Sequence, residues 1–226
     1  MIHIFDYILK NSYTKFGGQL YKQINGIPQG NNASPLIADL TLLAMETQFI
    51  LNNRNKFHKN KFTAARYMDD IFIMTDSIET FLDDCNGMYD TALSLDRTNQ
   101  TYDECNFLDL TVMVKNMVIT TKLYNKTDDY QFSILKYPFN ESNVHINLTM
   151  NTIHGEITRF YRCCSNKDDF IQRCKGLVST LLHNKHTSTH IRDKVFKTIA
   201  GNKSLRHKFD LTDVNNIRLQ MNYLFS

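Results

Sequence analysis

The chain has 226 residues, of which 42% are hydrophobic and 22% charged, with only eight glycines and three prolines. This composition excludes collagen-like, low-complexity and disordered proteins. The most apolar stretch, residues 36–51, is interrupted by Asp39, Glu46 and Gln48 and falls short of the ~20 apolar residues of a membrane span. We therefore expect no membrane partner, and the absence of a signal-peptide pattern at the first residues predicts an intracellular protein.

Charge is distributed unevenly along the sequence. The whole chain carries a net charge of +3, but residues 153–208 hold twelve Lys and Arg against four Asp and Glu, a net +8, and the remainder carries −5. A basic C-terminal third of this kind fits a polyanionic partner, and a solvated helical face is the alternative.

The N-terminal part predicts two helices separated by a strand or hairpin and a loop. Apolar residues recur at helical spacing over residues 2–13, and Gly17-Gly18 interrupts that pattern. Ser34 and Pro35 resemble an N-cap and a first-turn proline, so a second helix is expected to begin there. The elements predicted before this helix are a helix over 2–13, a β-like run over 19–24 and a turn-rich loop over 26–32.

An acidic pair lies within the most strand-like part of the sequence. Residues 62–75 are two apolar or β-prone runs with Asp69 and Asp70 between them, which predicts a buried hairpin with carboxylates at its tip. The downstream runs complete an α+β pattern with a helical appendage. They predict a helix over 78–93, strands over 106–115, 117–124 and 130–135, and mostly helices from about 156 to 200.

The two adjacent carboxylates are the strongest chemical signal. Burial of a carboxylate pair without a counter-charge is unfavourable, so a cation is expected beside Asp69 and Asp70. Adjacent side chains of an extended strand point to opposite faces, so one acid should be the principal metal ligand and the other an auxiliary. Oxygen ligands favour Mg²⁺, with Mn²⁺ as its substitute. A polar Asp-Asp turn without a metal is the alternative.

The sequence around this pair resembles a known family. Residues 21–38 and 65–70 resemble motifs B and C of the palm of reverse transcriptases, and residues 106–112 resemble the strand near their primer grip. Residues 121–127 and 159–165 resemble the sheet and early thumb of Penelope-like retroelement enzymes, the subgroup that the sequence resembles most.

This resemblance implies a fold and a reaction. The implied fold is a right-hand polymerase palm over residues 1–138, with helices packed on a small antiparallel sheet, followed by a mostly helical, basic thumb over 139–226. The implied activity is RNA-templated DNA synthesis, in which Asp69 and Asp70 are the catalytic metal ligands for two-metal phosphoryl transfer to a primer 3′-hydroxyl. The residues implied at the nucleotide and template are Gln29, Gly30, Tyr67 and Met68.

The implied thumb would bind an RNA template and DNA primer, or their hybrid. Arg159 and Arg162 lie in the thumb-like segment and, three residues apart, should share one helix face. Lys and Arg contacts to phosphates give sequence-independent, salt-sensitive affinity, so these two arginines are the expected backbone contacts. A solvated face is the alternative for them.

One motif of the family is not visible. Reverse transcriptases of this kind carry another metal-binding aspartate in motif A, and no such motif precedes residue 21. Asp6 is a weak substitute, because it lies on the helix that leads into motif B. Three functions stay open: a partial reverse transcriptase that needs a missing fingers and motif A segment from another chain or reading frame, an inactive nucleic-acid-binding relic of a polymerase, and a fragment of an RNA-dependent RNA polymerase.

A second metal constellation is weaker. His183, His186 and His190 would share a face of one helix, and imidazole with thiolate is good zinc ligation. The sequence lacks the paired Cys-x-x-Cys spacing of zinc motifs. We therefore expect the histidines to lie on an exposed basic helix, and the five cysteines to be free thiols.

Overall fold

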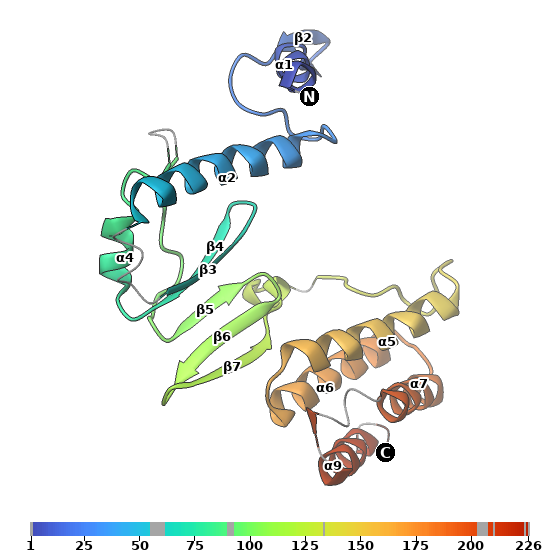
Figure 1. Cartoon of the computed structure of the whole chain (residues 1–226). Coiled ribbons are helices and arrows are strands. Elements are labelled where there is room, and N and C mark those ends of the chain that lie inside the picture. The colour runs from blue at the N-terminus through green and yellow to red at the C-terminus, as the bar shows by residue number, and fades with distance from the viewer. Residues whose placement is uncertain are drawn as a thin grey trace. The chain divides into compact units, whose positions relative to one another are not determined.

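Helices and small antiparallel sheets make up the computed structural model of the chain (Figure 1). This mixture confirms the predicted α+β class. The chain divides into two compact units, Met1–Arg97 and Thr98–Ser226, called the N-terminal and C-terminal units below. The structure describes residues 2–54, 62–89, 93–132, 134–202, 208–209, 211–223 and 225.

Two hairpins and their connecting helices form the described part of the N-terminal unit. The predicted first helix is confirmed but ends at Lys10, three residues earlier than predicted, and the β-like run that follows it is the second strand of a hairpin. The hairpin predicted over residues 62–75 is also confirmed. The elements are α1 (Ile2–Lys10), β1 (Tyr13–Phe16), β2 (Gln19–Lys22), α2 (Ser34–Asn52), β3 (Phe62–Tyr67), β4 (Asp70–Thr75) and α4 (Ile78–Asp84).

Helix α2 begins one residue away from its predicted cap. Ala33 is the N-cap and Ser34 is already helical, with Pro35 in the first turn. The hydroxyl of Ser34 donates a hydrogen bond to the carbonyl of Pro28, so it ties the preceding loop to the helix instead of accepting from a helical amide. The predicted cap was wrong because the hydroxyl has this partner in the loop.

The composition of α2 also bears on membrane contact. Among the described residues, α2 is the helix that is long and apolar enough to cross a membrane, a test that soluble core helices and signal sequences pass as well. The acidic residues of α2 therefore do not rule out a membrane-spanning helix, and the expectation of no membrane partner stays a prediction. Both acids have a local role, because Asp39 and Glu46 pair with Arg66 of β3.

Helix α4 is shorter than predicted. Ser77 caps its N-terminus by accepting from the amide of Thr80, and the helix ends at Asp84. Gly87 follows in the left-handed region (φ 82°), which an α-helix does not continue through. The predicted extent to residue 93 was therefore wrong within the described residues; residues 90–92 lie outside them.

A three-stranded antiparallel sheet opens the C-terminal unit, in the order β5-β6-β7. The strand predicted over 106–115 is two strands, because Leu108 (φ 53°) and Asp109 turn the chain between Phe107 and Leu110. The strand predicted over 130–135 was wrong, since its described residues are irregular and follow a short 3₁₀ helix. The elements are β5 (Glu104–Phe107), β6 (Leu110–Lys115), β7 (Val118–Leu123) and η1 (Lys126–Asp129).

Four described helices complete the C-terminal unit and hold the core of the chain. The helical stretch predicted from about residue 156 is confirmed, and its first helix begins earlier, at Ile146. The buried apolar cluster of the structure lies wholly between Leu123 and Met221, and α5 and α6 both pack on β7. The helices are α5 (Ile146–Cys163), α6 (Lys167–His183), α7 (Ser188–Gly201) and α9 (Leu211–Asn222).

The core makes a direct prediction about stability. Ile157 of α5 is 0% exposed, so Ile157→Ala leaves a cavity and should lower the free energy of unfolding by about 2–5 kcal/mol. Leu148→Ala on the same helix is the control, because Leu148 is 62% exposed and its loss should stay within about 0.5 kcal/mol. Urea unfolding followed by circular dichroism measures both, and equal losses would contradict this core.

Candidate functional site

The acidic pair lies at the two-residue turn of the β3–β4 hairpin. Tyr67 pairs with Asp70, so Met68 and Asp69 form the turn and Asp70 begins β4. Met68 has φ 53°, a left-handed conformation that few non-glycine residues adopt. The turn therefore presents two adjacent carboxylates, with Tyr67 and Met68 beside them.

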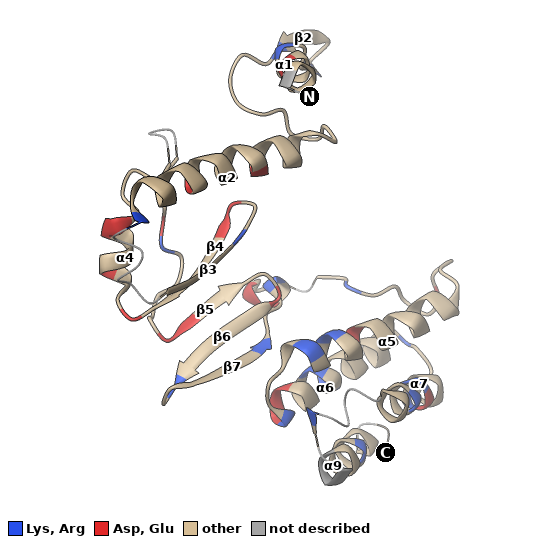
Figure 2. Ribbon diagram, viewed as in Figure 1, with Lys and Arg blue, Asp and Glu red and all other residues tan. Residues whose placement is uncertain are grey.

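Both carboxylates are open to solvent. Asp69 and Asp70 are exposed, and Figure 2 shows acidic residues at the tip of this hairpin. In the described parts of the chain, neither side chain makes a hydrogen bond or an ion pair. The expected burial of the hairpin tip was wrong, because α2 covers the hairpin at Arg66 and leaves the turn free.

The donor set suits a weakly held hard cation. Mg²⁺ is commonly held by one or two carboxylates together with substrate phosphates, and two exposed adjacent carboxylates supply the protein's share of such a site. No cluster of three or more His, Cys, Asp or Glu side chains able to hold a metal ion exists among the described residues. A complete metal cage is thus not provided by the part of the chain described.

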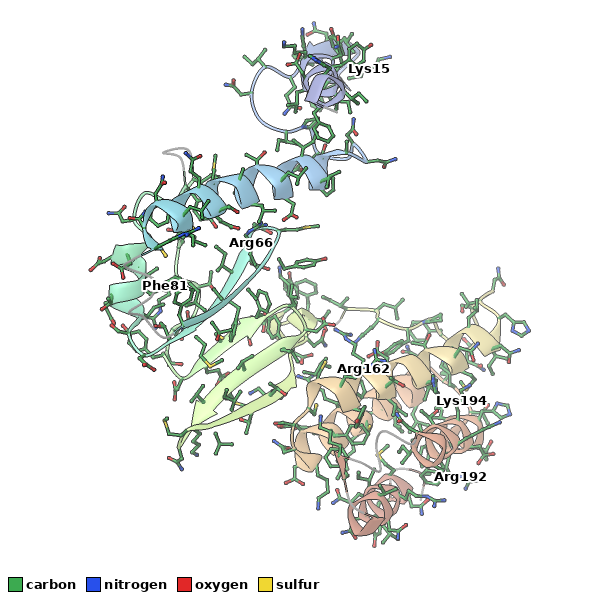
Figure 3. All side chains as sticks on the ribbon, viewed as in Figure 1. Lys15, Arg66, Phe81, Arg162, Arg192 and Lys194 are labelled. Carbon is green, nitrogen blue, oxygen red and sulfur yellow. The ribbon has the colours of Figure 1, made fainter. Side chains whose placement is uncertain are left out.

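Arg66 connects the hairpin to α2. Its Nε donates to Glu46 Oε1 at 2.6 Å, and its Nη1 donates to Asp39 Oδ1 at 2.7 Å and to the carbonyl of Met68 at 3.2 Å. Asp39 and Glu46 are seven residues apart, so they lie on the same face of α2. Figure 3 shows Arg66 between α2 and the hairpin.

The Arg66 contacts are partly desolvated. The side chains of Arg66 and Glu46 are 13% and 18% exposed, and Tyr89 donates its hydroxyl to Glu46 Oε1 at 2.7 Å. The hydrogen bond to Glu46 raises the pKa of the Arg66 guanidinium, and burial raises the pKa of the Tyr89 phenol. The sequence analysis did not identify Arg66. Two features could have indicated it: an arginine directly before Tyr67, and two acidic residues, Asp39 and Glu46, seven residues apart on an otherwise apolar helix.

The loop before α2 carries the other two residues predicted at the nucleotide. Gly30 has φ 86°, a conformation that favours glycine, and both Gln29 and Gly30 are exposed. The loop is closed by the bond from Ser34 to Pro28 and by Asn31 Oδ1, which accepts from the amide of Ala33. The structure groups Tyr67 and Met68 with the acidic turn, and Gln29 and Gly30 on this separate loop.

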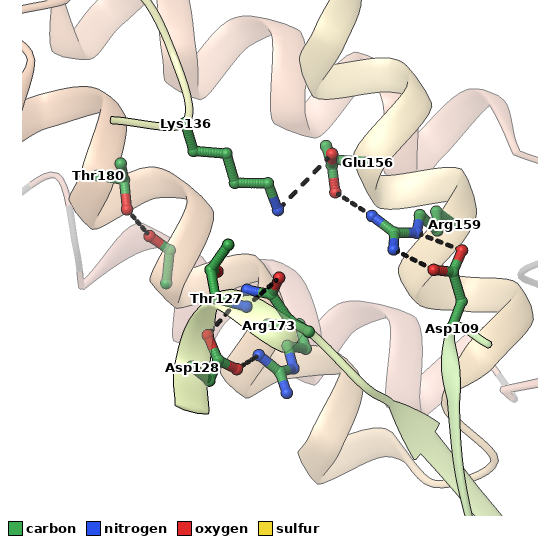
Figure 4. A network of polar contacts seen from close by, with 10 residues as sticks. Asp109, Thr127, Asp128, Lys136, Glu156, Arg159, Arg173 and Thr180 are labelled. Carbon is green, nitrogen blue, oxygen red and sulfur yellow. Dashed lines mark hydrogen bonds and ion pairs between the residues drawn. The ribbon is translucent and has the colours of Figure 1, made fainter. Parts of the chain in front are cut away.

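The two predicted phosphate contacts differ in their surroundings. Arg159 donates to both carboxylate oxygens of Asp109, at 3.0 and 2.6 Å, and lies 3.8 Å from Glu156 (Figure 4). Arg162, near the end of α5, is exposed. The charge of Arg159 is thus engaged by Asp109, and the charge of Arg162 faces solvent.

A second arginine also joins a helix to the sheet of the C-terminal unit. Arg173 of α6 donates from Nη1 to Asp128 at 2.5 Å and from Nη2 to the carbonyl of Leu123 at 2.8 Å. Figure 4 shows this pair together with the Asp109–Arg159 pair. These two arginines hold the sheet of this unit against α5 and α6.

Comparison of the two turns shows what is distinctive about Asp69 and Asp70. The β5–β6 turn has the same form as the β3–β4 turn, with Leu108 at φ 53° followed by Asp109. There the arginine binds the aspartate itself, whereas Arg66 binds the backbone carbonyl of Met68. Of these two turns, only the β3–β4 turn presents its carboxylates without a cationic partner.

The three histidines do not share a helix face. Helix α6 ends at His183 and α7 begins at Ser188, with Lys185 in the left-handed region (φ 64°) between them. His186 is buried with Nε2 2.9 Å from the carbonyl of Pro138, whereas His183 and His190 are exposed. The predicted shared face was wrong because the chain turns at Lys185; all five cysteines are free thiols.

Asp6, the weak substitute for a third acid, is paired within α1. Its Oδ2 lies 2.8 Å from Lys10 Nζ, one helical turn away. This contact is an exposed i,i+4 pair and accounts for the position of Asp6 without a metal.

Comparison with known proteins gives one match. Residues 2–96 match the family model described as reverse transcriptase (RNA-dependent DNA polymerase). No curated protein and no solved structure matches the chain. The match includes the Gly30 loop, α2 and the hairpin with Asp69 and Asp70. Residues 2–96 are therefore similar to reverse transcriptases, as the motifs predicted, and the Penelope-like subgroup stays a prediction.

Proposed function

We propose that the chain is part of a reverse transcriptase and carries its acidic turn, its template loop and a thumb. The observation that carries the proposal is the β3–β4 turn, where Asp69 and Asp70 are exposed without a cationic partner inside the segment similar to reverse transcriptases. An arginine fixes the backbone of this turn and leaves its carboxylates free. These features fit a turn that binds a divalent cation together with a nucleotide.

Each residue of the proposed site has a distinct role. Asp69 and Asp70 would hold a Mg²⁺ or Mn²⁺ ion, one as the principal ligand and the other as the auxiliary one. Bound ions of this kind stabilise the attacking and leaving oxygens of an in-line phosphoryl transfer. Gln29 and Gly30 lie under the incoming nucleotide and template base, where the small Gly30 allows close approach of the backbone. Tyr67 and Met68 contact the same nucleotide.

The proposed enzyme is incomplete in the residues described. One turn with two carboxylates cannot surround two ions, and the described residues contain no larger acidic cluster. The N-terminal unit buries the apolar side chains of Ile37, Phe81 and Cys85, while many of its large apolar residues are exposed. A further segment, supplying fingers and motif A from this protein or a second chain, would cover apolar surface and add the missing carboxylate.

The proposed thumb is the basic helical region. Basic residues lie near the C-terminal end of α5 in Figure 2, and Arg162 is exposed there for contact with phosphate. Arg159 would contact phosphate only in exchange for Asp109. Residues 203–207 of the basic stretch lie outside the described residues. The partner would be an RNA template with a DNA primer, or their hybrid.

The proposed division into palm and thumb is a functional one. We place the palm over residues 1–138 and the thumb over 139–226, so that β5–β7 belongs to the palm. The compact units divide earlier, between Arg97 and Thr98, because β7 packs on α5 and α6. The sheet would then connect the proposed palm to the proposed thumb.

A specific observation favours a second function. The lack of a third carboxylate among the described residues fits a relic that binds nucleic acid without polymerising. The match to a family of RNA-dependent DNA polymerases gives less support to a fragment of an RNA-dependent RNA polymerase. Metal binding, and primer extension in the presence of a fragment with fingers and motif A, distinguish an enzyme from a relic.

The first test is the metal. Mn²⁺ should bind weakly and broaden the amide signals of residues 67–71 in nuclear magnetic resonance spectra. Asp69→Asn should weaken this binding by about tenfold, because loss of a charged oxygen beside a divalent ion removes on the order of 1–2 kcal/mol even in water. Asp76→Asn, an exposed acid just after β4, is the control for general charge. Unchanged binding in Asp69→Asn would refute the assignment.

The second test is the salt dependence of nucleic-acid binding. Log affinity for duplex DNA should fall linearly with log salt, and Arg162→Ala should reduce the slope by about 0.9, the value of one phosphate contact. Lys15→Ala, on β1 outside the basic stretch, should leave the slope unchanged. Filter binding or fluorescence anisotropy at several salt concentrations measures it. A salt-independent interaction would leave the basic stretch as a solvated face.

The third test is primer extension on an RNA template with Mg²⁺ or Mn²⁺. The chain alone should not extend the primer, since alignment of the attacking and leaving oxygens needs both ions and supplies as much as ~7–11 kcal/mol of the barrier. Addition of a fragment with fingers and motif A should restore extension, and Asp69→Asn should abolish it again. Extension by the chain alone would contradict the proposal, and Asp6→Ala would show whether Asp6 is then the third acid.

A further inference from the structure

We propose that Arg66 is a positioning residue that fixes the Met68–Asp69 turn and so presents Asp69 and Asp70 to a cation. The inference rests on the proposed function of that turn for its metal, but the effect of Arg66 on the turn can be measured without a metal. Arg66 itself makes no hydrogen bond to the carboxylate of Asp69 or Asp70.

The geometry of the guanidinium supports this role. Its Nε is held by Glu46, and its Nη1 is shared between Asp39 and the carbonyl of Met68. A planar guanidinium can make these bonds together because its donors point in fixed, different directions. A lysine ammonium could replace one of the ion pairs, but it does not reproduce this fork. The combination of the Met68 contact with both ion pairs is therefore specific to arginine.

The turn is a backbone conformation that needs such support. Met68 is left-handed at φ 53° and 53% exposed, so packing of its own side chain contributes little to holding it. Non-glycine residues keep this conformation where surrounding contacts determine it. The Arg66 bond to the Met68 carbonyl joins this turn to α2, because the same guanidinium binds Asp39 and Glu46 of that helix.

The charges around Arg66 are compatible with a cation at the turn. Glu46 and Asp39 neutralise the guanidinium, and Tyr89 fixes the orientation of Glu46. An arginine bonded directly to Asp69 or Asp70 would instead occupy the carboxylate, as Arg159 occupies Asp109. The arrangement thus fixes the backbone of the turn and keeps its acids available.

The experiment compares Arg66→Lys with a matched arginine. Arg173→Lys is the control, because Arg173 also bridges a carboxylate and a backbone carbonyl, in the C-terminal unit. Asp39→Asn is the second control, because it removes a charge from the Arg66 network but retains an oxygen that accepts from Nη1. The readouts are amide hydrogen exchange and HN–Hα couplings of Met68 and Asp69 without metal, then Mn²⁺ broadening at residues 67–71, with thermal unfolding of every variant.

The expected result separates position from stability. Arg66→Lys should change the Met68 coupling, speed exchange at the turn and weaken Mn²⁺ binding by about tenfold, as loss of an outer-shell partner commonly does. Arg173→Lys should lower the unfolding temperature by a similar amount without these changes, and Asp39→Asn should leave the turn unchanged.

Three outcomes would overturn the inference. The first is an unchanged Met68 coupling in Arg66→Lys, and the second is an equal change in Asp39→Asn. The third is a change at the turn in Arg173→Lys, which would make it an effect of global stability. If Mn²⁺ fails to bind the unaltered chain, the proposed metal function fails, and the metal-free coupling still decides the role of Arg66.

Discussion

Arginine–carboxylate pairs join helices to neighbouring strands and turns in both units of this protein. In the N-terminal unit Arg66 of β3 binds Asp39 and Glu46 of α2, and in the C-terminal unit Arg159 and Arg173 bind Asp109 and Asp128. A bidentate or bridging guanidinium fixes direction as well as distance, which a single apolar contact does not. The acceptors that each arginine binds decide which acidic side chains are neutralised and which stay free.

The two units differ in how much of their apolar surface is buried. The C-terminal unit encloses a continuous cluster contributed by β7 and all four described helices, whereas few apolar side chains are buried among the described residues of the N-terminal unit. Since apolar burial is the main source of stability, the C-terminal unit has the core of an independent fold. The described residues of the N-terminal unit, which carries the acidic turn, leave many large apolar side chains exposed, and this exposure supports the proposal that a further segment covers them. The proposed need for a complementing segment thus agrees with the chemistry of two carboxylates on one turn.

Agreement between sequence and structure was greatest where local signals were strong. Turn glycines, helical spacing and the acidic break between two β-prone runs located α1, α2 and the β3–β4 hairpin. Disagreements arose where one contact outweighed a local preference. Ser34 gives its hydroxyl to Pro28 and does not cap α2, and Lys185 reverses the chain between His183 and His190. The Leu108-Asp109 turn, whose aspartate is held by Arg159 fifty residues later, divides a run that looks like one strand.

The α+β class and an acidic hairpin turn after a glycine loop follow from the sequence alone, because spacing and turn chemistry act over a few residues. The sequence also identified the segment similar to reverse transcriptases. The folded structure alone shows that Asp69 and Asp70 are exposed, that Arg159 is paired while Arg162 faces solvent, and that Arg66 donates to the carbonyl of Met68 in the turn. The physical reason is that exposure and charge pairing depend on which side chains meet across 20 to 50 residues of chain. The residue pattern along a single strand or helix does not predict which distant side chain will be the partner.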